Sequence, residues 1–241
     1  MKPVPPVPGG GTLFLVATPI GNLEDVTRRA LRTLSEVSAV AAEDTRRTRR
    51  LLAHFGIAAP VVSLFEHNER QRIPRLVERL QAGESLALVT DAGSPGIADP
   101  GYRLARAASE AGLRVESVPG PSALIAALQV SGLPTDRFTF AGFLPVKPGA
   151  RRRLLEELAE RQETVVVFEA PHRIEKALVD LEQVWGTRPI ALARELTKVF
   201  EQVLRGSPSE VRAALGAEQR RGEMVLVLSG QGFAPAAERE S

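Results

Sequence analysis

Short apolar runs alternate along the first half of the chain with longer segments whose apolar residues have helical spacing. The runs are rich in Val, Leu and Ala, which is typical of strands that are buried on both faces. They occupy residues 12–17, 39–42, 61–65, 86–89 and 114–118. Five alternations of strand and helix predict a mostly parallel, five-stranded sheet with helices on both faces.

The pattern changes at residues 119–122, where a turn-rich Pro-Gly-Pro-Ser segment precedes an Ala/Leu-rich helix. Beyond it strands outnumber helices, so we expect hairpins and a mixed sheet. The predicted strands are 138–143, 164–168, 189–193, 199–204 and 224–228, and the predicted helices are 123–130, 149–160, 173–184 and 208–215. The sequence therefore predicts an α/β protein of two domains, 12–118 and 119–231, between a disordered tail at 1–11 and a loose tail at 232–241.

The connection after the run at 86–89 is longer than a turn between strand and helix needs. Residues 91–96 read Asp-Ala-Gly-Ser-Pro-Gly, whose glycines allow the backbone to approach a ligand closely. A plain turn, in which Asp99 caps the next helix and Pro100 opens it, accounts for residues 99–102 but leaves 91–96 unexplained. Because ligands bind at the carboxyl ends of parallel strands, residues 91–96 are predicted to form a ligand-binding loop.

Composition and missing motifs exclude several kinds of chemistry. The 241 residues include no cysteine, which excludes disulfides, thiolate metal sites and a thiol nucleophile, and the three histidines lack metal-ligand spacing. The dinucleotide fingerprint, the P-loop and the serine-nucleophile elbow are missing. The net charge of +2 gives no overall basic field, and no apolar run is long enough to span a membrane. We therefore expect a soluble, cytoplasmic protein without a metal site.

Seven short peptides, mostly at predicted strand ends, follow one another in a specific order. They are TPIGNL (18–23), AEDTR (42–46), DAGSP (91–95) with DPG (99–101), PGPS (119–122), PHR (171–173), ARELTK (193–198) and GEMV (222–225). Together they resemble a family of ribosomal RNA small-subunit methyltransferases within the tetrapyrrole methylase superfamily, over residues 12 to 230. One departure is that residues 168–170 read Phe-Glu-Ala where the family has Tyr-Glu-Ser.

The resemblance implies a two-domain fold, a homodimer, and S-adenosylmethionine as a cofactor held in the cleft between the domains. It also implies the reaction, which is methylation of the ribose 2'-hydroxyl of a cytidine in the decoding region of 16S (small-subunit) rRNA. Glycine- and proline-rich loops suit a small ligand that is held largely by backbone groups. The residues expected to bind the cofactor are Pro19, Asp91, Gly93, Ser94, Pro95, Ser122, Phe143, Arg194, Gly222 and Met224.

A ribose hydroxyl is a poor nucleophile, so we expect a neighbouring group that accepts its proton or stabilises the developing alkoxide. Each candidate also has a structural alternative: Asp44 as a helix cap, Glu195 paired with Arg194 or Arg173, and Lys198 on a solvated turn. The candidate catalytic residues are Glu43, Asp44, Glu169, Glu195 and Lys198.

Arginines along one predicted helix are the candidates for holding RNA. Arg46, Arg47, Arg49 and Arg50 could contact phosphates beside the target nucleotide. His67 on another loop could touch the nucleotide itself. A solvated helix face and a capping or core histidine are the alternatives. The expected partner is small-subunit rRNA or the assembled small ribosomal subunit. Competing interpretations are a tetrapyrrole C-methyltransferase of the same superfamily and a ribosome assembly factor without catalysis.

Overall fold

The computed structural model describes residues 9–99 and 101–233. Within them, the residues up to Ser122 form one compact unit and those from Ala123 form a second, called unit 1 and unit 2 below. The tails predicted at 1–11 and 232–241 lie largely outside the described residues. Gly11 nevertheless donates a backbone hydrogen bond to Leu80, with 2.7 Å between N and O. The residue just before the first strand is therefore held by a backbone hydrogen bond.

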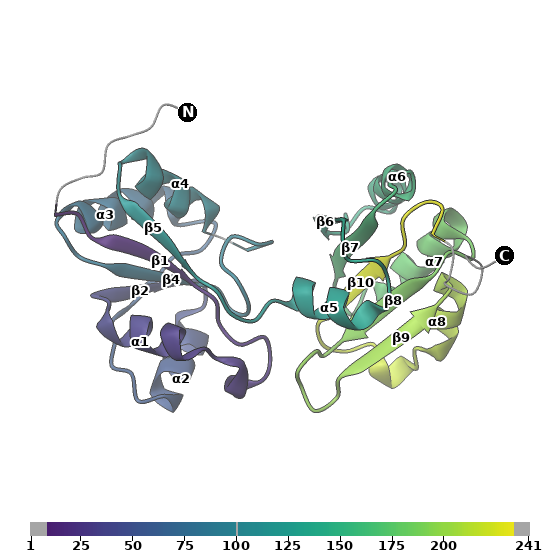
Figure 1. The fold of residues 1–241 in the computed structure, drawn as a ribbon, viewed down its shortest axis with the longest axis horizontal. Helices are drawn as coiled ribbons and strands as arrows, with labels where there is room; N and C mark the ends of the chain where they lie inside the picture. Colours follow the sequence, from purple (N-terminus) through teal and green to yellow (C-terminus); the bar gives the residue numbers. More distant parts are fainter. Residues whose placement is uncertain (1–8, 100, 234–241) are drawn as a thin grey trace. The chain divides into compact units, whose positions relative to one another are not determined.

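Unit 1 is built on a five-stranded sheet in which every pairing is parallel, as the alternation of strands and helices predicted (Figure 1). Strands β2 and β4 are buried along their whole length, which suits their apolar composition. The order across the sheet is β3-β2-β4-β1-β5. The strands are β1 (Thr12–Val16), β2 (Ala39–Ala42), β3 (Val61–Ser63), β4 (Leu86–Val89) and β5 (Arg114–Val118).

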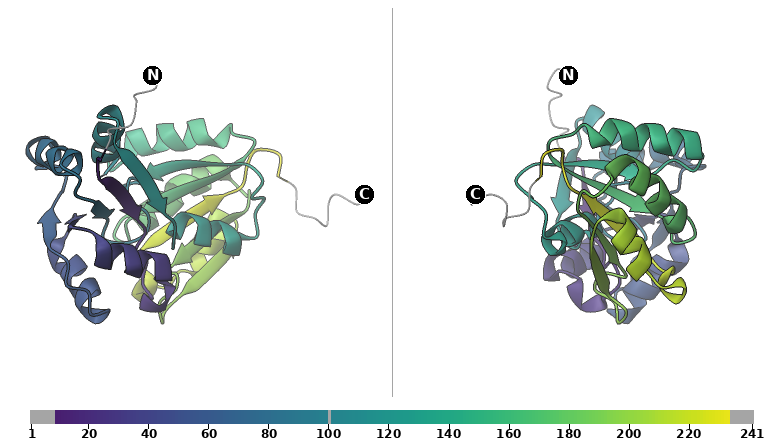
Figure 2. Two further views of the ribbon diagram at one scale, coloured as in Figure 1. Left: turned by 60° about the vertical axis from the view of Figure 1, so that its left-hand side comes forward. Right: turned by 90° about the vertical axis from the view of Figure 1, so that its right-hand side faces the viewer.

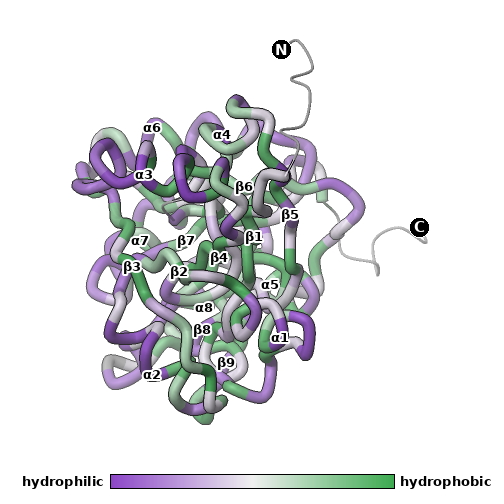
Figure 3. The backbone as a smooth tube through the Cα atoms, turned by 90° about the vertical axis from the view of Figure 1, so that its left-hand side faces the viewer, coloured by the Kyte–Doolittle hydropathy of each residue, from purple (hydrophilic) through white to green (hydrophobic). Residues whose placement is uncertain are grey.

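Helices cover both faces of this sheet, because successive residues of a strand point to opposite sides. Leu86 and Leu88 of β4 pack with leucines of α3 and α4, whereas Ala87 and Val89 pack with α1 and α2. Figure 3 shows hydrophobic strands among helices with many hydrophilic positions. The helices are η1 (Leu23–Asp25), a 3-10 turn, and α1 (Arg28–Glu36), α2 (Thr45–His54), α3 (Glu69–Gln81) and α4 (Tyr102–Glu110).

The loops that follow the strands of unit 1 all emerge at one edge of the sheet, because the strands are parallel. In the order of the strands across the sheet, these loops are 64–68, 43–44, 90–101, 17–22 and 119–122. Neighbouring loops start about 5 Å apart, which is the spacing between strands. The loops after β2, β4 and β1 are therefore adjacent, and they carry most of the site residues predicted in unit 1.

Unit 2 contains a mixed five-stranded sheet, as predicted (Figures 1 and 2). Strands β6 and β7 are parallel, and the other three pairings are antiparallel. The order across the sheet is β6-β7-β10-β8-β9. The strands are β6 (Phe138–Phe143), β7 (Thr164–Glu169), β8 (Ile190–Arg194), β9 (Gln202–Gly206) and β10 (Met224–Leu228).

The main core of unit 2 lies between one face of its sheet and three helices, α6, α7 and α8. Helix α5 contacts β8, β9 and β10 and does not contribute to this core. Inside the core, the carboxylate of Asp180 accepts hydrogen bonds from Arg151 at 2.7 Å and from Arg152 at 2.6 Å. The helices are α5 (Ala123–Ser131), α6 (Pro148–Ala159), α7 (Ile174–Trp185), α8 (Pro208–Ala214) and the 3-10 turn η2 (Ala217–Gln219).

The prediction that Asp99 caps the next helix is wrong. Helix α4 begins only at Tyr102, and Gly101 occupies the capping position. The Asp99 carboxylate instead accepts a hydrogen bond from the Thr90 hydroxyl, with 2.8 Å between the oxygens. This bond ties the far end of the β4 loop back to the residue that follows the strand.

The strand predicted at 199–204 begins later than the alternating pattern indicated, at Gln202. The reason is a turn after β8, where Thr197 adopts a φ of 66°. This turn leaves Val199 and Phe200 exposed, at 94% and 73% of their surface. The apolar pair continues the alternation in the sequence, but it belongs to the turn.

Candidate active site

The loops after β1 and β4 are joined by their backbones. Thr18 N–H donates to Gly93 O at 2.9 Å, and Gly93 N–H donates to Thr18 O at 3.0 Å. Gly93 has a φ of 79°, in the left-handed region that favours glycine. The Thr18 hydroxyl also donates to the carbonyl oxygen of Thr90 at 3.2 Å. The predicted ligand loop is therefore fixed at its start to the neighbouring β1 loop.

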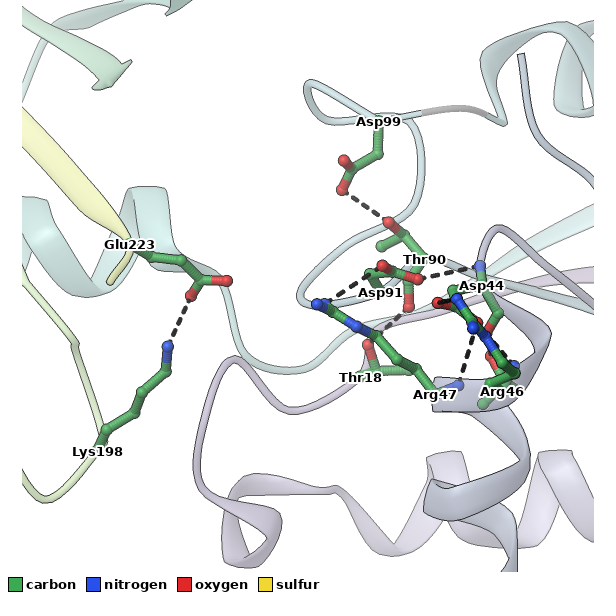
Figure 4. A network of polar contacts seen from close by, with 10 residues as sticks. Thr18, Asp44, Arg46, Arg47, Thr90, Asp91, Asp99, Lys198 and Glu223 are labelled. Atoms are coloured by element: carbon green, nitrogen blue, oxygen red, sulfur yellow. Dashed lines mark hydrogen bonds and ion pairs between the residues drawn. The ribbon is translucent and has the colours of Figure 1, made fainter. Parts of the chain in front are cut away.

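Asp91 connects this β4 loop to the first turn of helix α2 (Figure 4). One carboxylate oxygen accepts a hydrogen bond from the Asp44 N–H at 3.1 Å, and the other lies 3.3 Å from Arg47 Nη1. The loops after β2 and β4 are thereby held together, as their adjacent places in the sheet require.

Asp44 is the N-cap of α2, which is the structural role that the sequence analysis gave as the alternative to catalysis. Its carboxylate accepts hydrogen bonds from the backbone N–H groups of Arg46 and Arg47, at 2.8 and 3.4 Å. The hydrogen bond from Arg46 is the main reason that the pKa of Asp44 lies below its usual range. A carboxylate engaged in this way is a poor proton acceptor, and the geometry favours a structural role for it.

Glu43 has the opposite environment. Burial raises the pKa of this half-buried carboxyl, and the negative charges of Asp99 and Asp91 raise it further. A hydrogen bond with Thr90 opposes the shift without cancelling it. A carboxyl whose pKa is raised above its usual value is better suited to accept a proton as a general base. We call Glu43, Asp91 and Asp99 the acidic cluster.

A cavity of about 350 Å³ opens beside the acidic cluster, between helix α2 and the β1 loop. We call it the α2 cavity. Four of its lining residues lie at positions 47, 50, 51 and 54, which share one face of a helix. The complete lining is Thr18, Pro19, Gly21, Leu23, Arg47, Thr48, Arg50, Leu51, His54, Thr90 and Asp91.

Some of the cofactor residues predicted in unit 1 line the α2 cavity, and others lie in the β4 loop outside it. Pro19 and Asp91 line the α2 cavity, whereas Gly93 is buried in the contact between the two loops. Ser94 and Pro95 follow it in the same loop and are half-buried, and the carbonyl oxygen of Ser94 accepts a bond from Ile97 N–H at 3.3 Å. Ser122 is half-buried at the end of unit 1.

The residues predicted to hold RNA are not all brought together. Arg47 and Arg50 line the α2 cavity, whereas Arg46 and Arg49 are exposed and do not line it. Arg46 lies 3.4 Å from Asp44. His67 is exposed in the β3 loop, where its ring packs edge-on against Phe65, and it does not line the cavity.

The sequence analysis missed His54 as a cavity residue. The signal was present, because His54 lies seven positions after Arg47 and four after Arg50, which places all three on one face of a helix.

In unit 2, Lys198 joins the ends of two strands. Its Nζ lies 2.9 Å from Glu195 Oε1, just after β8, and 3.2 Å from Glu223 Oε2, just before β10. Burial lowers the pKa of Lys198, but its bond to Glu195 and the charge of Glu223 outweigh this and raise it. Lys198 is therefore a protonated cation at neutral pH. Glu195 forms its ion pair with Lys198 and not with Arg194 or Arg173, as its structural alternative expected, although the charge of Arg194 also acts on it.

Gly222 leaves room for this pairing. Its φ is 80°, and a Cβ added there would lie 2.0 Å from Glu195 Oε1. Burial raises the pKa of Glu195, but the hydrogen bond from Lys198 and that from the Glu223 N–H outweigh it, and the pKa falls below its usual range.

The other predicted residues of unit 2 lie on three strands. Arg194 and Met224 are both buried and are partners in the β8–β10 register. The Arg194 guanidinium donates to the carbonyl oxygen of Phe200 at 3.2 Å and so holds the exposed turn. Phe143 ends β6 with 53% of its surface exposed.

Glu169 forms a buried ion pair with Arg173 through one oxygen, whereas its Oε2 is buried without a hydrogen-bond partner among the described residues. Its carboxylate lies 2.5 Å from Arg173 Nη2 and accepts a hydrogen bond from the Ala170 N–H at 2.7 Å. Burial raises the pKa of Glu169, and the neighbouring N–H and arginine only partly offset this. The side chains at positions 168 and 170 carry no hydroxyl that could donate to this Oε2.

Within residues 9–99 and 101–233, no group of three or more His, Asp or Glu side chains is arranged to hold a metal ion. None of the helices in the described part of the chain is long and apolar enough to cross a membrane.

Comparisons with known proteins identify the family. The model of the Tetrapyrrole (Corrin/Porphyrin) Methylases matches residues 12–212. Two relatives named "Ribosomal RNA small subunit methyltransferase I" come from Xylella fastidiosa and Pseudomonas aeruginosa. The first is 54% identical and covers 94% of this chain and 84% of its own, and the second is 51% identical and covers 91% and 79%.

Solved structures share the fold at low sequence identity. A cobalt precorrin-4 methyltransferase has a TM-score of 0.67 at 20% identity, over 96% of this chain and 99% of its own. A uroporphyrin-III-C-methyltransferase from Thermus thermophilus has a TM-score of 0.65 at 22% identity, over 91% and 94%. The fold class predicted from the sequence is confirmed. With the family model matched over most of the sequence, the chain belongs to the tetrapyrrole (corrin/porphyrin) methylases.

Proposed function

We propose that this chain transfers a methyl group from S-adenosylmethionine to the ribose 2'-hydroxyl of a cytidine in small-subunit rRNA. Membership of a methylase family supports the reaction class and its methyl donor, and the names of relatives at 51–54% identity support the rRNA substrate. The single observation that carries the chemistry is Glu43, a carboxyl with a raised pKa beside a cavity at the carboxyl edge of a parallel sheet.

The residues of the acidic cluster fit the cofactor by charge. S-adenosylmethionine carries a sulfonium, an ammonium and a carboxylate, and so has a net positive charge. Asp91 and Asp99 place negative charge near the start and end of the β4 loop, and Glu43 adds a carboxyl from the neighbouring β2 loop. Asp91 and the backbone around Gly93 and Ser94 are the groups that we assign to the ammonium or sulfonium end.

Glu43 is the group that we assign to the acceptor. When bound, S-adenosylmethionine supplies an electrophilic methyl group. Above its raised pKa, Glu43 is a carboxylate that accepts the proton of the ribose hydroxyl. Most of the remaining acceleration comes from positioning, because methyl transfer needs in-line approach of the nucleophile. The fixed contact of Thr18 with Gly93 holds the two loops that provide this position.

For Lys198 we propose charge stabilisation and not proton abstraction, since its raised pKa keeps it protonated. Glu195 acts through Lys198, as the carboxylate that fixes the ammonium. We further propose that the protein is a homodimer and acts in the cytoplasm on rRNA or on the assembled small subunit.

The acceptor can be identified by offering two substrates in separate reactions. Purified protein is incubated with labelled S-adenosylmethionine and either small ribosomal subunits that lack the modification or a uroporphyrinogen. Label in the rRNA alone supports the proposal. Label in the tetrapyrrole alone contradicts it, and binding of the cofactor without any transfer favours an assembly factor.

A further inference from the structure

The α2 cavity differs in charge from the acidic cluster beside it. Its lining includes the guanidinium groups of Arg47 and Arg50 and the imidazole of His54. Its one carboxylate, Asp91, is already paired with Arg47 at 3.3 Å. In the part of the chain that the structure describes, Arg50 forms no ion pair with a carboxylate. The cavity therefore offers unneutralised positive charge to a ligand.

The rest of the lining is apolar or carries hydroxyl groups. Pro19 and Leu23 come from the β1 loop, and Leu51 faces the cavity from α2. Leu23 is 40% exposed, although it is a large apolar residue. An apolar wall beside guanidinium groups suits a ligand that has both a planar or sugar portion and an anionic portion.

We propose that the α2 cavity binds one nucleotide of an RNA strand, with its phosphate at Arg50 and Arg47 and its sugar and base against Leu23 and Leu51. This inference rests on the proposed function and assigns its substrate to a defined site. A cavity of about 350 Å³ is of a size for one nucleotide.

The nucleotide site and the proposed cofactor site share Asp91, but their other charged residues differ in sign. A net positive cofactor is repelled by Arg47 and Arg50, whereas an RNA phosphate is attracted to them. The same phosphate is repelled by the carboxylates of Glu43 and Asp99, neither of which lines the cavity. The two ligands are therefore directed to neighbouring groups, and the ribose of the bound nucleotide is brought towards Glu43.

The test measures RNA binding and cofactor binding separately in the full-length protein. Three variants are compared: Arg50→Gln removes the phosphate contact, Leu23→Trp fills the cavity from an exposed position, and Arg49→Gln is the matched control. Arg49 lies on the same helix, donates to Thr45 Oγ1 at 3.4 Å and does not line the cavity. The probes are purified small-subunit rRNA over a range of salt concentrations and, in separate titrations, S-adenosylmethionine.

We expect Arg50→Gln to weaken rRNA binding about tenfold and to lower the slope of log K against log salt by about 0.7, the value for one single-strand phosphate contact. Leu23→Trp should also weaken rRNA binding, and both variants should bind S-adenosylmethionine as the wild type does. An Arg50→Gln protein that matches Arg49→Gln in rRNA affinity and salt slope overturns the inference, and so does loss of cofactor affinity in either cavity variant. The proposed function fails differently, when the wild type binds rRNA through these residues but transfers no methyl group to it.

Discussion

Arg47 and Asp91 join helix α2 to the β4 loop, with 3.3 Å between Arg47 Nη1 and Asp91 Oδ2. The other oxygen of Asp91 accepts a hydrogen bond from the N–H of Asp44, just before the same helix. One carboxylate therefore fixes both the cavity-lining helix and the loop that we assign to the cofactor. The β2 and β4 loops meet here because their strands are neighbours in a parallel sheet.

Two replacements of Asp91 should weaken cofactor binding to different extents. Asp91→Ala removes the negative charge and leaves the Asp44 N–H without its acceptor, so we expect affinity for S-adenosylmethionine to fall about tenfold or more. Asp91→Asn keeps an oxygen that accepts this bond and should lie between Asp91→Ala and the wild type. Calorimetric titration measures both. Wild-type affinity in Asp91→Ala would show that the β4 loop does not bind the cofactor.

The pH dependence of methyl transfer should report on Glu43. Its pKa is raised by burial and by Asp99 and Asp91, so the proton-accepting form appears only as the pH rises through that raised value. The rate is expected to increase with pH in this range and then to level off. Glu43→Gln should lower the rate by about 10²–10⁴-fold and abolish this rise, since a general base contributes that much.

The control for Glu43 is Glu66→Gln, which changes an exposed carboxyl in the neighbouring β3 loop. It should leave both the rate and the pH profile unchanged. If Glu43→Gln retains the pH-dependent rise of the wild type, another group is the base.

Gly222→Ala should disrupt the Lys198 contacts. The new Cβ would lie 2.0 Å from Glu195 Oε1, so the Glu195 side chain must move away from Lys198. Gly232→Ala is a matched control, because Gly232 has a similar φ of 76° and nothing within 4 Å of its Cβ position. Both variants carry the backbone strain of about 1–2 kcal/mol, but only Gly222→Ala should lose methyl transfer. Equal activity in the two would remove Lys198 and Glu195 from the proposed site.

Asp180→Ala should destabilise unit 2 strongly. Arg151 is buried with 3% of its surface exposed, and its partner in the core is Asp180. Removing one member of a buried ion pair costs about 3–5 kcal/mol in the free energy of unfolding. Urea denaturation followed by circular dichroism measures this. Glu110→Ala, which removes the exposed pair with Arg106, should change stability little, and equal effects in the two variants would contradict the argument.

Much of the fold could be predicted from the sequence because the apolar runs are short and regularly spaced. Every predicted strand of unit 1 corresponds to an observed one, and the mixed sheet of unit 2 was expected from the excess of strands. The errors lie where a local pattern was decided by tertiary contacts. Asp99 precedes a Pro-Gly pair and so resembles a helix cap in sequence, but in the fold its carboxylate accepts a hydrogen bond from the Thr90 hydroxyl.

The site was harder to predict, because its chemistry depends on burial and on which loops meet. Glu43 and Asp44 are adjacent in sequence, and no sequence pattern shows that Glu43 has a raised pKa and Asp44 a lowered one. The difference arises because Asp44 caps α2, whereas Glu43 is half-buried beside the carboxylates of the β4 loop. Likewise, Lys198 meets Glu223 only because β8 and β10 are neighbours in the sheet.

The most direct test of the central claim is the chemical position of the transferred methyl group. Small subunits that lack the modification are treated with the protein and labelled S-adenosylmethionine, and the rRNA is digested to nucleosides for mass analysis. We predict that the label is found in 2'-O-methylcytidine and that Glu43→Gln removes it. Label on a nucleobase, or on a ribose other than that of cytidine, would contradict the proposed reaction.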